Sequence, residues 1–400
     1  MTESTTKKVK EPLFHITKRA SMPFWKAAGI RVLSVLAAVI ICSVMSTILI
    51  GRNPFAIFGS FVKGIFIDPW TLLQDTALLL AFGLAIVPAF RMKYWNMGAN
   101  GQVLMGCLAA IYCMINVPDE VPGGVVIIIM LLAAIAVSVI WAAIPAIFKA
   151  LFNTNETLFT LMMNYIAAGL VNHFCYKQTK YQKINIGIVN LMSKRAWLPQ
   201  LGNKYLLPIL IVALMTAFVF VYMKYSKHGY EIEVVGESAN TAKYVGINVK
   251  KVIIRTLVLS GAICGVIGFL YAGAISHTVS EKTATLGFTA ILIAWLGKFN
   301  PLIMIGTALF VVVMQTGTGQ INTDFSLGST DFSNMIIGIV FFFVIGCEFF
   351  ITYSIKAAGG WKEFTAKAGK IFKRKKTAET TQGVGEAANE TDRQTEDEKK

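Results

Sequence analysis

Residues 123–148 read GGVVIIIMLLAAIAVSVIWAAIPAIF, and no charged side chain occurs among them. A helix needs about twenty apolar residues to cross the roughly 30 Å of hydrocarbon in a bilayer, so this stretch is predicted to be a transmembrane helix. The whole chain of 400 residues agrees, because 55% of its residues are hydrophobic and only 15% are charged, against about 25% charged residues in an average soluble domain. The sequence therefore predicts an all-α, polytopic integral membrane protein.

Similar apolar windows predict about ten transmembrane helices, with a range of eight to ten. They cover 32–50, 72–90, 97–116, 123–148, 157–176, 205–223, 252–276, 285–298, 300–317 and 334–353. The windows near 285–317 are short and are interrupted at Asn300-Pro301. They are interpreted either as two short helices or as one broken helix that lines a cavity.

The net charge of +15 is explained by topology rather than by a nucleic-acid partner. With the N-terminus inside the cell, 28 of the 37 Lys and Arg residues fall in cytoplasmic segments, as the positive-inside rule requires. Both termini are then cytoplasmic. The outer loop that holds Lys177 to Lys204 contains six of the remaining nine basic residues and departs from the rule.

Three parts of the chain are distinguished by composition. Residues 1–31 are predicted to be a cytoplasmic N-terminal tail, too long for the basic region of a signal peptide. Residues 32–353 form the transmembrane domain, with a long cytoplasmic loop at 224–251. Residues 354–400 are basic and then acidic, and the polar end is predicted to be disordered.

Few residues suggest chemistry of their own. No G-x-x-x-x-G-K-[ST] phosphate-binding motif occurs, the four histidines are far apart, and the six cysteines lie in or at the edge of apolar runs. We therefore expect no metal site and no catalytic residue. Asp75 and Glu348 are the two carboxylates inside apolar windows, where either a transport role or an interfacial, structural role is possible.

Amides and small residues open the third window, which reads YWNMGANGQVLMG over 94–106. Asn96 and Asn100 are four residues apart, as are Gly98 and Gln102, so each pair shares one side of a helix. These amides either face a polar path for the solute or bond neighbouring helices together. Both interpretations stay open.

The fifth window begins NETLFTLMMNYIAAG over 155–169. Its polar and small residues recur at three- and four-residue spacing, which gives one stripe on an otherwise apolar helix. The stripe consists of Thr157, Thr160, Asn164, Ala168 and Asn172. For Asn164 both a pathway role and a packing role are retained.

The cytoplasmic loop contains GESANTAKYVGI over 236–247. Glu237 to Tyr244 is predicted to be a short exposed helix, with Ala239 and Ala242 on a small-residue face that suits the groove of another protein. Gly246 can end this helix. The window that follows contains Gly261 and Gly265, whose spacing is typical of close helix packing.

These three motifs, in this order, resemble one family over roughly residues 30–350. It comprises the inner-membrane permeases of bacterial ABC importers for branched-chain amino acids, ribose-type sugars and nucleosides. The long N-terminal region and the Asn-Glu-Thr…Met-Asn-Tyr segment are most similar to the nucleoside and simple-sugar branch.

The resemblance implies a location and partners. The location is the bacterial cytoplasmic membrane, and the partners are a second permease subunit, a cytoplasmic ABC ATPase and an extracytoplasmic substrate-binding lipoprotein. ATP and Mg²⁺ would bind the ATPase, so no cofactor is expected on this chain.

The resemblance also implies roles for individual residues. The residues that match the ATPase-coupling loop are Gly236, Glu237, Ala239, Ala242 and Gly246, and those that match the third-helix motif are Asn96, Gly98, Gly101 and Gln102. At Asn100 the family usually has a glutamate.

The combined prediction is a permease that moves a polar, uncharged solute by alternating access. Nucleosides such as guanosine or adenosine are the expected solutes, and ribose-type sugars are the alternative. A stand-alone secondary transporter is the third hypothesis. Candidate residues of the path are Asn96, Asn100, Gln102, Asn164 and Asp75, and candidate packing residues are Gly98, Gly101, Gly261 and Gly265.

Overall fold

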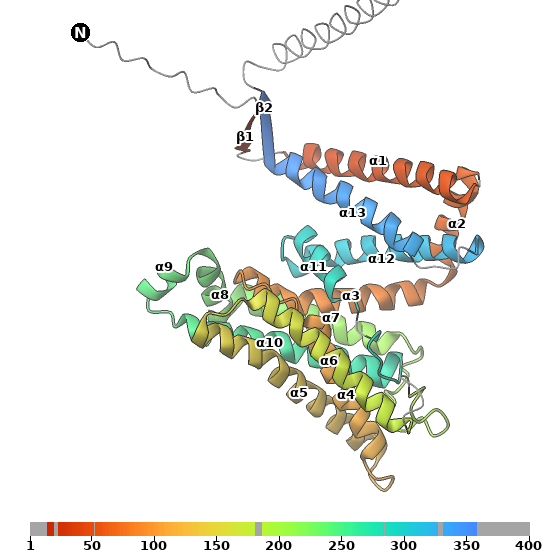
Figure 1. Cartoon of the computed structure of the whole chain (residues 1–400), viewed down its shortest axis with the longest axis vertical. Helices are drawn as coiled ribbons and strands as arrows, with labels where there is room; N and C mark the ends of the chain where they lie inside the picture. The colour runs from red at the N-terminus through yellow and green to blue at the C-terminus, as the bar shows by residue number, and fades with distance from the viewer. Residues whose placement is uncertain are drawn as a thin grey trace, which may run out of the picture. The chain divides into compact units, whose positions relative to one another are not determined.

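The computed structural model describes residues 14–19, 23–51, 53–180, 186–283, 285–326 and 331–357 (Figure 1). The chain divides into two compact units, one made of Met1–Met45 with Gly338–Lys400 and the other of Ser46–Ile337. About half of the predicted N-terminal tail and almost all of the predicted C-terminal tail lie outside the described residues. Each unit is taken by itself below.

The first unit pairs the two ends of the membrane domain. Its elements are β1 (Phe14–Lys18), α1 (Phe24–Ile50), α13 (Asp331–Thr352) and β2 (Tyr353–Ala357). The strands are antiparallel, from Phe14 opposite Ala357 to Lys18 opposite Tyr353. Within this unit Ser34 Oγ donates to the carbonyl of Phe343 at 2.7 Å. Residues just before α1 and just after α13 are therefore side by side.

The second unit is helical. Its elements are α2 (Pro54–Ile67), α3 (Pro69–Arg91), α4 (Ala99–Asn116), α5 (Gly123–Phe152), α6 (Glu156–Gln178), α7 (Leu206–Tyr225), α8 (Lys227–Glu237), α9 (Ala239–Tyr244), α10 (Val249–Leu270), the π-helical turn η1 (Tyr271–Ile275), α11 (Gly287–Leu296) and α12 (Pro301–Asp324).

Helix α3 is the centre of this unit. Every residue from 76 to 90 is buried, as expected of a helix that is apolar on all sides. It packs against α7, α10, α11 and α12, while α10 packs against α4 and α5. Asp68 caps the start of α3, because its carboxylate accepts from the Thr71 amide at 3.2 Å.

Among the described helices, eight are long and apolar enough to cross a membrane. This confirms the polytopic all-α prediction, apart from the short β1–β2 pair. Of the two interpretations of 285–317, the structure shows separate helices, because α11 ends before Asn300 and α12 begins at Pro301. The ten residues of α11 extend only about 15 Å, so the window at 285–298 does not cross the membrane as a helix by itself. The window at 300–317 belongs to the longer α12, and the short helix α2 was not predicted.

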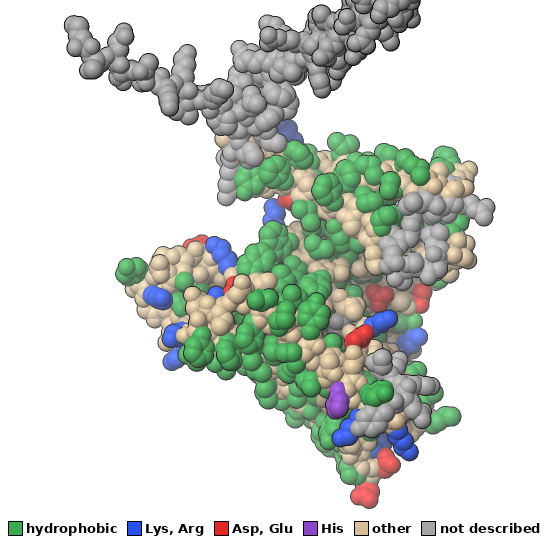
Figure 2. Space-filling model, viewed as in Figure 1, with side chains coloured by type: hydrophobic (Ala, Val, Ile, Leu, Met, Phe, Trp, Pro, Cys, Tyr) green, Lys and Arg blue, Asp and Glu red, His purple; other side chains and the backbone are tan. Residues whose placement is uncertain are grey.

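The second unit has two polar ends and an apolar flank (Figure 2). We call them the α8–α9 end and the opposite end. At the α8–α9 end the guanidinium of Arg91 donates to the carbonyl of Phe299 at 3.2 Å. At the opposite end Arg195 donates to Asp119 at 2.6 Å. The flank between them exposes large apolar side chains such as Leu132 and Leu214, as a lipid-facing surface does.

Candidate functional site

A buried amide network begins at the start of α4. Asn96 is 0% exposed, and its Nδ2 donates to Ser260 Oγ of α10 at 3.3 Å. Its Oδ1 accepts from the Gly98 amide at 3.0 Å and from Gln102 Nε2 at 3.4 Å. Ser260 in turn donates to the carbonyl of Ala85 in α3 at 2.7 Å. The network joins α3, α4 and α10.

Gln102 extends this network to α5. Its backbone carbonyl accepts from Ser138 Oγ at 2.6 Å. Its side-chain Oε1 is buried without a hydrogen-bond partner, although its Nε2 is bonded to Asn96. Gln102 is therefore held from two sides inside the bundle.

Asn164 bonds α6 to the first turn of α4. Its Oδ1 accepts from the Gly101 amide at 2.8 Å, and its Nδ2 donates to the carbonyl of Met97 at 2.7 Å. One turn earlier on α6, Thr160 Oγ1 accepts from the Met97 amide at 3.1 Å. The first amides of a helix have no partner within the helix, so part of the polar stripe on α6 supplies partners to the start of α4.

Asn100 bonds the start of α4 to the start of α11. Its Oδ1 accepts from the Gly287 amide at 2.7 Å. A glutamate at this position would offer the same kind of acceptor, so this contact does not depend on charge. All four predicted amides thus bond protein groups, which favours the helix-bonding interpretation of the sequence over an open path lined by free amides.

The predicted carboxylate Asp75 lies away from these amides, toward the other end of α3. Asp75 is exposed in the second turn of α3, whereas Asn96, Asn100, Gln102 and Asn164 gather where α4 begins. Glu348 is half-buried on α13, in the part of the chain that belongs to the other unit.

The four predicted packing glycines occupy close approaches between helices. A Cβ at Gly98 would lie 3.2 Å from Thr160 Cβ, and one at Gly101 would lie 3.0 Å from Asn164 Cα. At Gly261 it would lie 2.7 Å from Ala142 Cβ, and at Gly265 it would lie 2.6 Å from Ile135 Cα. At these separations a side chain would push the helices apart.

The chain breaks its helical path after α10, between 276 and 286. The carbonyls of this segment bond the middle of α4 and the last turns of α6, because Cys107 of α4 donates to Thr278 at 3.7 Å and Cys175 of α6 donates to Val279 at 3.2 Å. Asn172 of α6 donates to the carboxylate of Glu281 at 2.8 Å. A break in the helical path between membrane-spanning helices is typical of a solute or ion path.

Glu281 is a polar site residue that the sequence analysis missed. It lies between two predicted windows and was therefore counted as part of a loop. The only sequence feature that pointed to this region was the short window at 285–298. It predicted an interrupted helix but did not identify Glu281 as part of the interruption.

The predicted coupling segment forms two helices instead of one. Ser238 separates α8 from α9 and caps α9, because its Oγ accepts from the Thr241 amide at 3.3 Å. Gly246 follows the end of α9 with a φ of 83°, a conformation that glycine adopts without strain.

Only part of the predicted small-residue face is exposed. Gly236 and Ala242 are buried within the chain, and a Cβ at Gly236 would clash with the carbonyl of Arg91. Glu237 and Ala239 are exposed, and Tyr244 is 92% exposed. The surface of α9 is therefore more aromatic and less uniformly small than predicted.

His228 lies beneath this segment, on α8. Its Nδ1 is 2.7 Å from the Tyr222 hydroxyl, and its Nε2 is 3.4 Å from Thr256 Oγ1. Burial and the nearby Arg255 guanidinium lower the pKa of His228. The imidazole is thus held neutral where α7, α8 and α10 meet.

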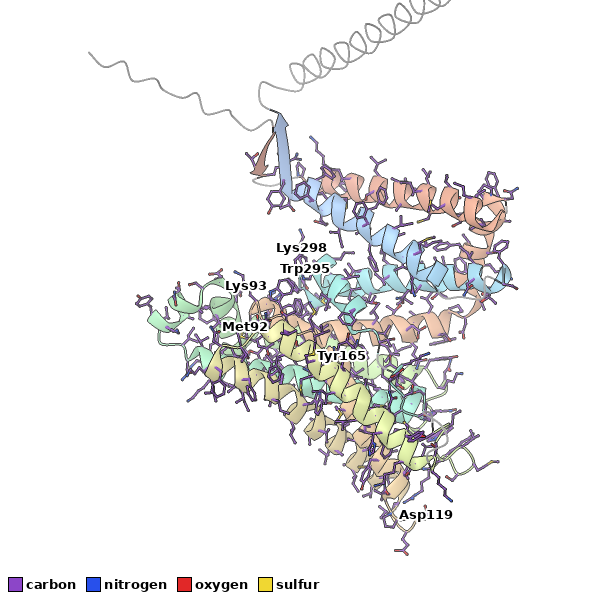
Figure 3. The ribbon with its side chains drawn as sticks, in the orientation of Figure 1. Met92, Lys93, Asp119, Tyr165, Trp295 and Lys298 are labelled. Atoms are coloured by element: carbon purple, nitrogen blue, oxygen red, sulfur yellow. The ribbon has the colours of Figure 1, made fainter. Side chains whose placement is uncertain are left out.

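Aromatic side chains cluster at the α8–α9 end, where Figure 3 labels Lys93, Trp295 and Lys298. The ring centroids of Trp95 and Trp295 are 5.9 Å apart, and those of Phe90 and Trp95 are 5.3 Å apart. Such rings are typical of a membrane–water interface. Within the described ranges no group of three metal-ligating side chains occurs.

A model of one protein family matches residues 66–345, and its description is the permease component of the branched-chain amino acid transport system. No solved structure matches the chain.

Curated relatives agree with this match. A glucose ABC transporter permease protein of Haloferax volcanii is 27% identical over 85% of this chain and 93% of that protein. A nucleoside ABC transporter permease protein of Lactococcus lactis is 26% identical over 74% of this chain and 84% of that protein. A guanosine ABC transporter permease protein of Bacillus subtilis is 30% identical over 68% of this chain and 79% of that protein.

Proposed function

The chain belongs to the branched-chain amino acid transport system permease family, as a multi-pass permease subunit of an ABC importer, and from this premise we propose that its solute is a nucleoside. The observation that supports this solute is the similarity to relatives named for nucleosides and guanosine, which extends over 68–74% of the chain. Guanosine and adenosine are the specific candidates.

A simple sugar is the second candidate. The glucose permease relative covers 85% of this chain, which is more than the two nucleoside relatives cover. Both kinds of solute are polar and uncharged, so both fit a membrane domain with few embedded charges. An amino acid would need partners for two opposite charges.

The broken segment between α10 and α11 is the proposed place where the solute passes. Glu281 and Asn172 put a carboxylate and an amide next to each other, and Glu281 is exposed. Between membrane-spanning helices such groups face water or protein rather than lipid. A carboxylate accepts paired N–H or O–H donors, which guanine and ribose both offer. We place the second permease subunit opposite this surface.

The α8–α9 segment is the proposed contact with a cytoplasmic ABC ATPase, which would bind ATP and Mg²⁺. Exposed Glu237, Ala239 and Tyr244 would form the contact, while buried Gly236 and Ala242 would fix α8 and α9 to the bundle. Closure of the ATPase would then rock the permease halves and open the path to alternate sides. A substrate-binding lipoprotein would deliver the solute from outside.

Competition in uptake tests the solute. Cells that express the complete transporter should take up labelled guanosine, and excess adenosine should inhibit this uptake while excess ribose or glucose should not. Inhibition by a sugar without inhibition by another nucleoside would establish the second candidate instead.

Charge reversal at Glu237, the last residue of α8, tests the ATPase contact. Glu237→Lys should reduce both uptake and co-purification of the ATPase to background while the permease remains in the membrane. Glu233→Lys is the matched control, because Glu233 is also exposed but lies one turn earlier on α8. Equal effects of the two substitutions would exclude a specific role for Glu237.

A further inference from the structure

A cavity of about 440 Å³ lies at the α8–α9 end, beside the proposed ATPase contact. Four separate parts of the chain line it: the α3–α4 connection, the α5–α6 connection, the α8–α9 segment and the start of α10. Its charged lining residues are Lys93, Lys149, Lys243, Lys250 and Glu156. The cavity is strongly cationic because its lining has four lysines and one glutamate.

The single carboxylate is already paired. Lys149 Nζ lies 2.7 Å from Glu156 Oε2, and both side chains are largely buried. Lys93, Lys243 and Lys250 are exposed residues on other parts of the same lining. An anion in the cavity would therefore meet three flexible ammonium groups in addition to the fixed ion pair.

Tyr94 supplies a second and independent observation. The residue is only 3% exposed, it lines the cavity, and its hydroxyl is buried without a hydrogen-bond partner. Burial raises the pKa of Tyr94, so the hydroxyl keeps its proton and can donate it to an acceptor. A buried hydroxyl without a partner costs free energy unless a ligand satisfies it.

The surface beside the cavity is apolar. Leu151 lines the cavity and is 56% exposed, and the neighbouring Phe152 is 68% exposed. A ligand that combines a negative headgroup with acyl chains matches this arrangement, whereas a free anion uses only the cationic part. Basic pockets between membrane helices bind the headgroups of anionic lipids in this way.

We propose that this cavity binds a phosphate group, and specifically the phosphate of an anionic phospholipid headgroup, through Lys93, Lys250 and the Tyr94 hydroxyl. The acyl chains lie along the exposed end of α5. Because α9 also lines the cavity, a bound lipid connects the proposed coupling segment to the bundle.

Lipid binding to the purified full chain tests the proposal. Phosphatidylglycerol should raise the thermal unfolding midpoint in detergent more than phosphatidylcholine does. Lys93→Gln combined with Lys250→Gln should weaken phosphatidylglycerol binding about 10- to 30-fold, since each lysine near an anionic surface contributes on the order of 1 kcal/mol. Native mass spectrometry measures the same binding directly.

The matched controls are Lys251→Gln and Lys298→Gln. Both residues are exposed at the same end of the bundle and neither lines the cavity, so phosphatidylglycerol binding should be unchanged. If the controls weaken binding as much as the double variant does, the effect is a general surface charge and the proposal is wrong.

Tyr94→Phe provides a test that does not depend on charge. Without lipid this variant should unfold at the same or a higher temperature, because a buried hydroxyl without a partner is removed. With phosphatidylglycerol its gain in midpoint should be smaller than that of the unchanged chain. An equal gain would show that the hydroxyl does not contact the lipid.

Two further experiments distinguish a bound phospholipid from other occupants of the cavity. Displacement of phosphatidylglycerol by millimolar inorganic phosphate would identify a free anion site and overturn the lipid assignment. Loss of ATPase co-purification in the double lysine variant, with unchanged lipid binding, would show that an acidic group of the ATPase occupies the cavity. No displacement by phosphate, with ATPase association retained, is the outcome that supports a lipid.

Discussion

Asn164 is the side chain with the clearest structural role at the scale of single residues. It satisfies one amide and one carbonyl at the start of α4. Asn164→Ala should lower the free energy of unfolding by about 1–2 kcal/mol, because two interhelical bonds disappear and the Gly101 amide loses its partner. Unfolding in a denaturing detergent measures this change.

Asn240→Ala is the control for that prediction, since Asn240 is exposed on α9. Its free energy of unfolding should change by less than about 0.5 kcal/mol. If both variants were equally stable, the hydrogen bonds of Asn164 would contribute nothing measurable to the fold.

His228 should make stability depend on pH. Its pKa is lowered in the folded chain by burial and by Arg255, so below pH 6.5 the unfolded chain binds a proton that the folded chain does not. Stability is therefore fully present above pH 6.5 and declines as the pH falls below it. The unfolding midpoint should drop between pH 7 and pH 5.5.

His228→Gln should flatten this pH dependence, while His173→Gln, at an exposed position on α6, should leave it intact. Unfolding midpoints at several pH values provide the measurement. A slope that is identical in the unchanged chain and in His228→Gln would contradict the role given to the imidazole.

The packing between helices predicts different effects of adding a side chain at two glycines, Gly265 and Gly169. A Cβ at Gly265 would lie 2.6 Å from Ile135 Cα, whereas a Cβ at Gly169 would meet nothing within 4 Å. Gly265→Ala should therefore lower the free energy of unfolding by about 1–3 kcal/mol by separating α5 and α10. Gly169→Ala should be neutral or stabilising by up to about 1 kcal/mol, because alanine favours a helix. The same detergent unfolding assay compares them, and similar losses in both would contradict the packing account.

Sequence patterns predicted the long helices well because length and apolar content alone determine them. They failed for α2 and α11, which are shorter than the bilayer is thick, and for the β1–β2 pair, whose strands are far apart in the chain. Elements stabilised by tertiary contacts leave a weak local signal.

The candidate site, like the fold, could be predicted from the sequence only in part. The spacing of Asn96, Asn100 and Gln102 showed that the amides were special, but it could not decide whether they bond protein or face the solute. Their partners Ser260, Gly287 and Ser138 come from distant helices. Glu281 was missed because only the path of the chain after α10 brings it to Asn172.

The distribution of basic residues gives a prediction at the scale of the whole molecule. The α8–α9 end should be cytoplasmic and the end that holds Asp119 should be outside, as the positive-inside rule requires. Figure 3 shows Asp119 and Lys298 at opposite ends of their unit. In intact cells a membrane-impermeant thiol reagent should label Asp119→Cys and should not label Lys298→Cys, which is the paired control. The reverse pattern would invert the topology.

The basic outer loop is partly explained by structure. Arg195, one of its six basic residues, donates to Asp119 and to the carbonyls of Val117 and Val121. This side chain bonds the loop after α6 to the loop between α4 and α5. It is therefore a structural residue, which explains why one of the six basic residues stands in this loop.

The most direct test of the account is solute uptake by the reconstituted transporter. Proteoliposomes that contain this chain, its partner permease and the ATPase should accumulate labelled guanosine only when ATP and the binding protein are both supplied, and Glu237→Lys should abolish that accumulation. Guanosine uptake that follows an ion gradient and persists without the ATPase would contradict the account.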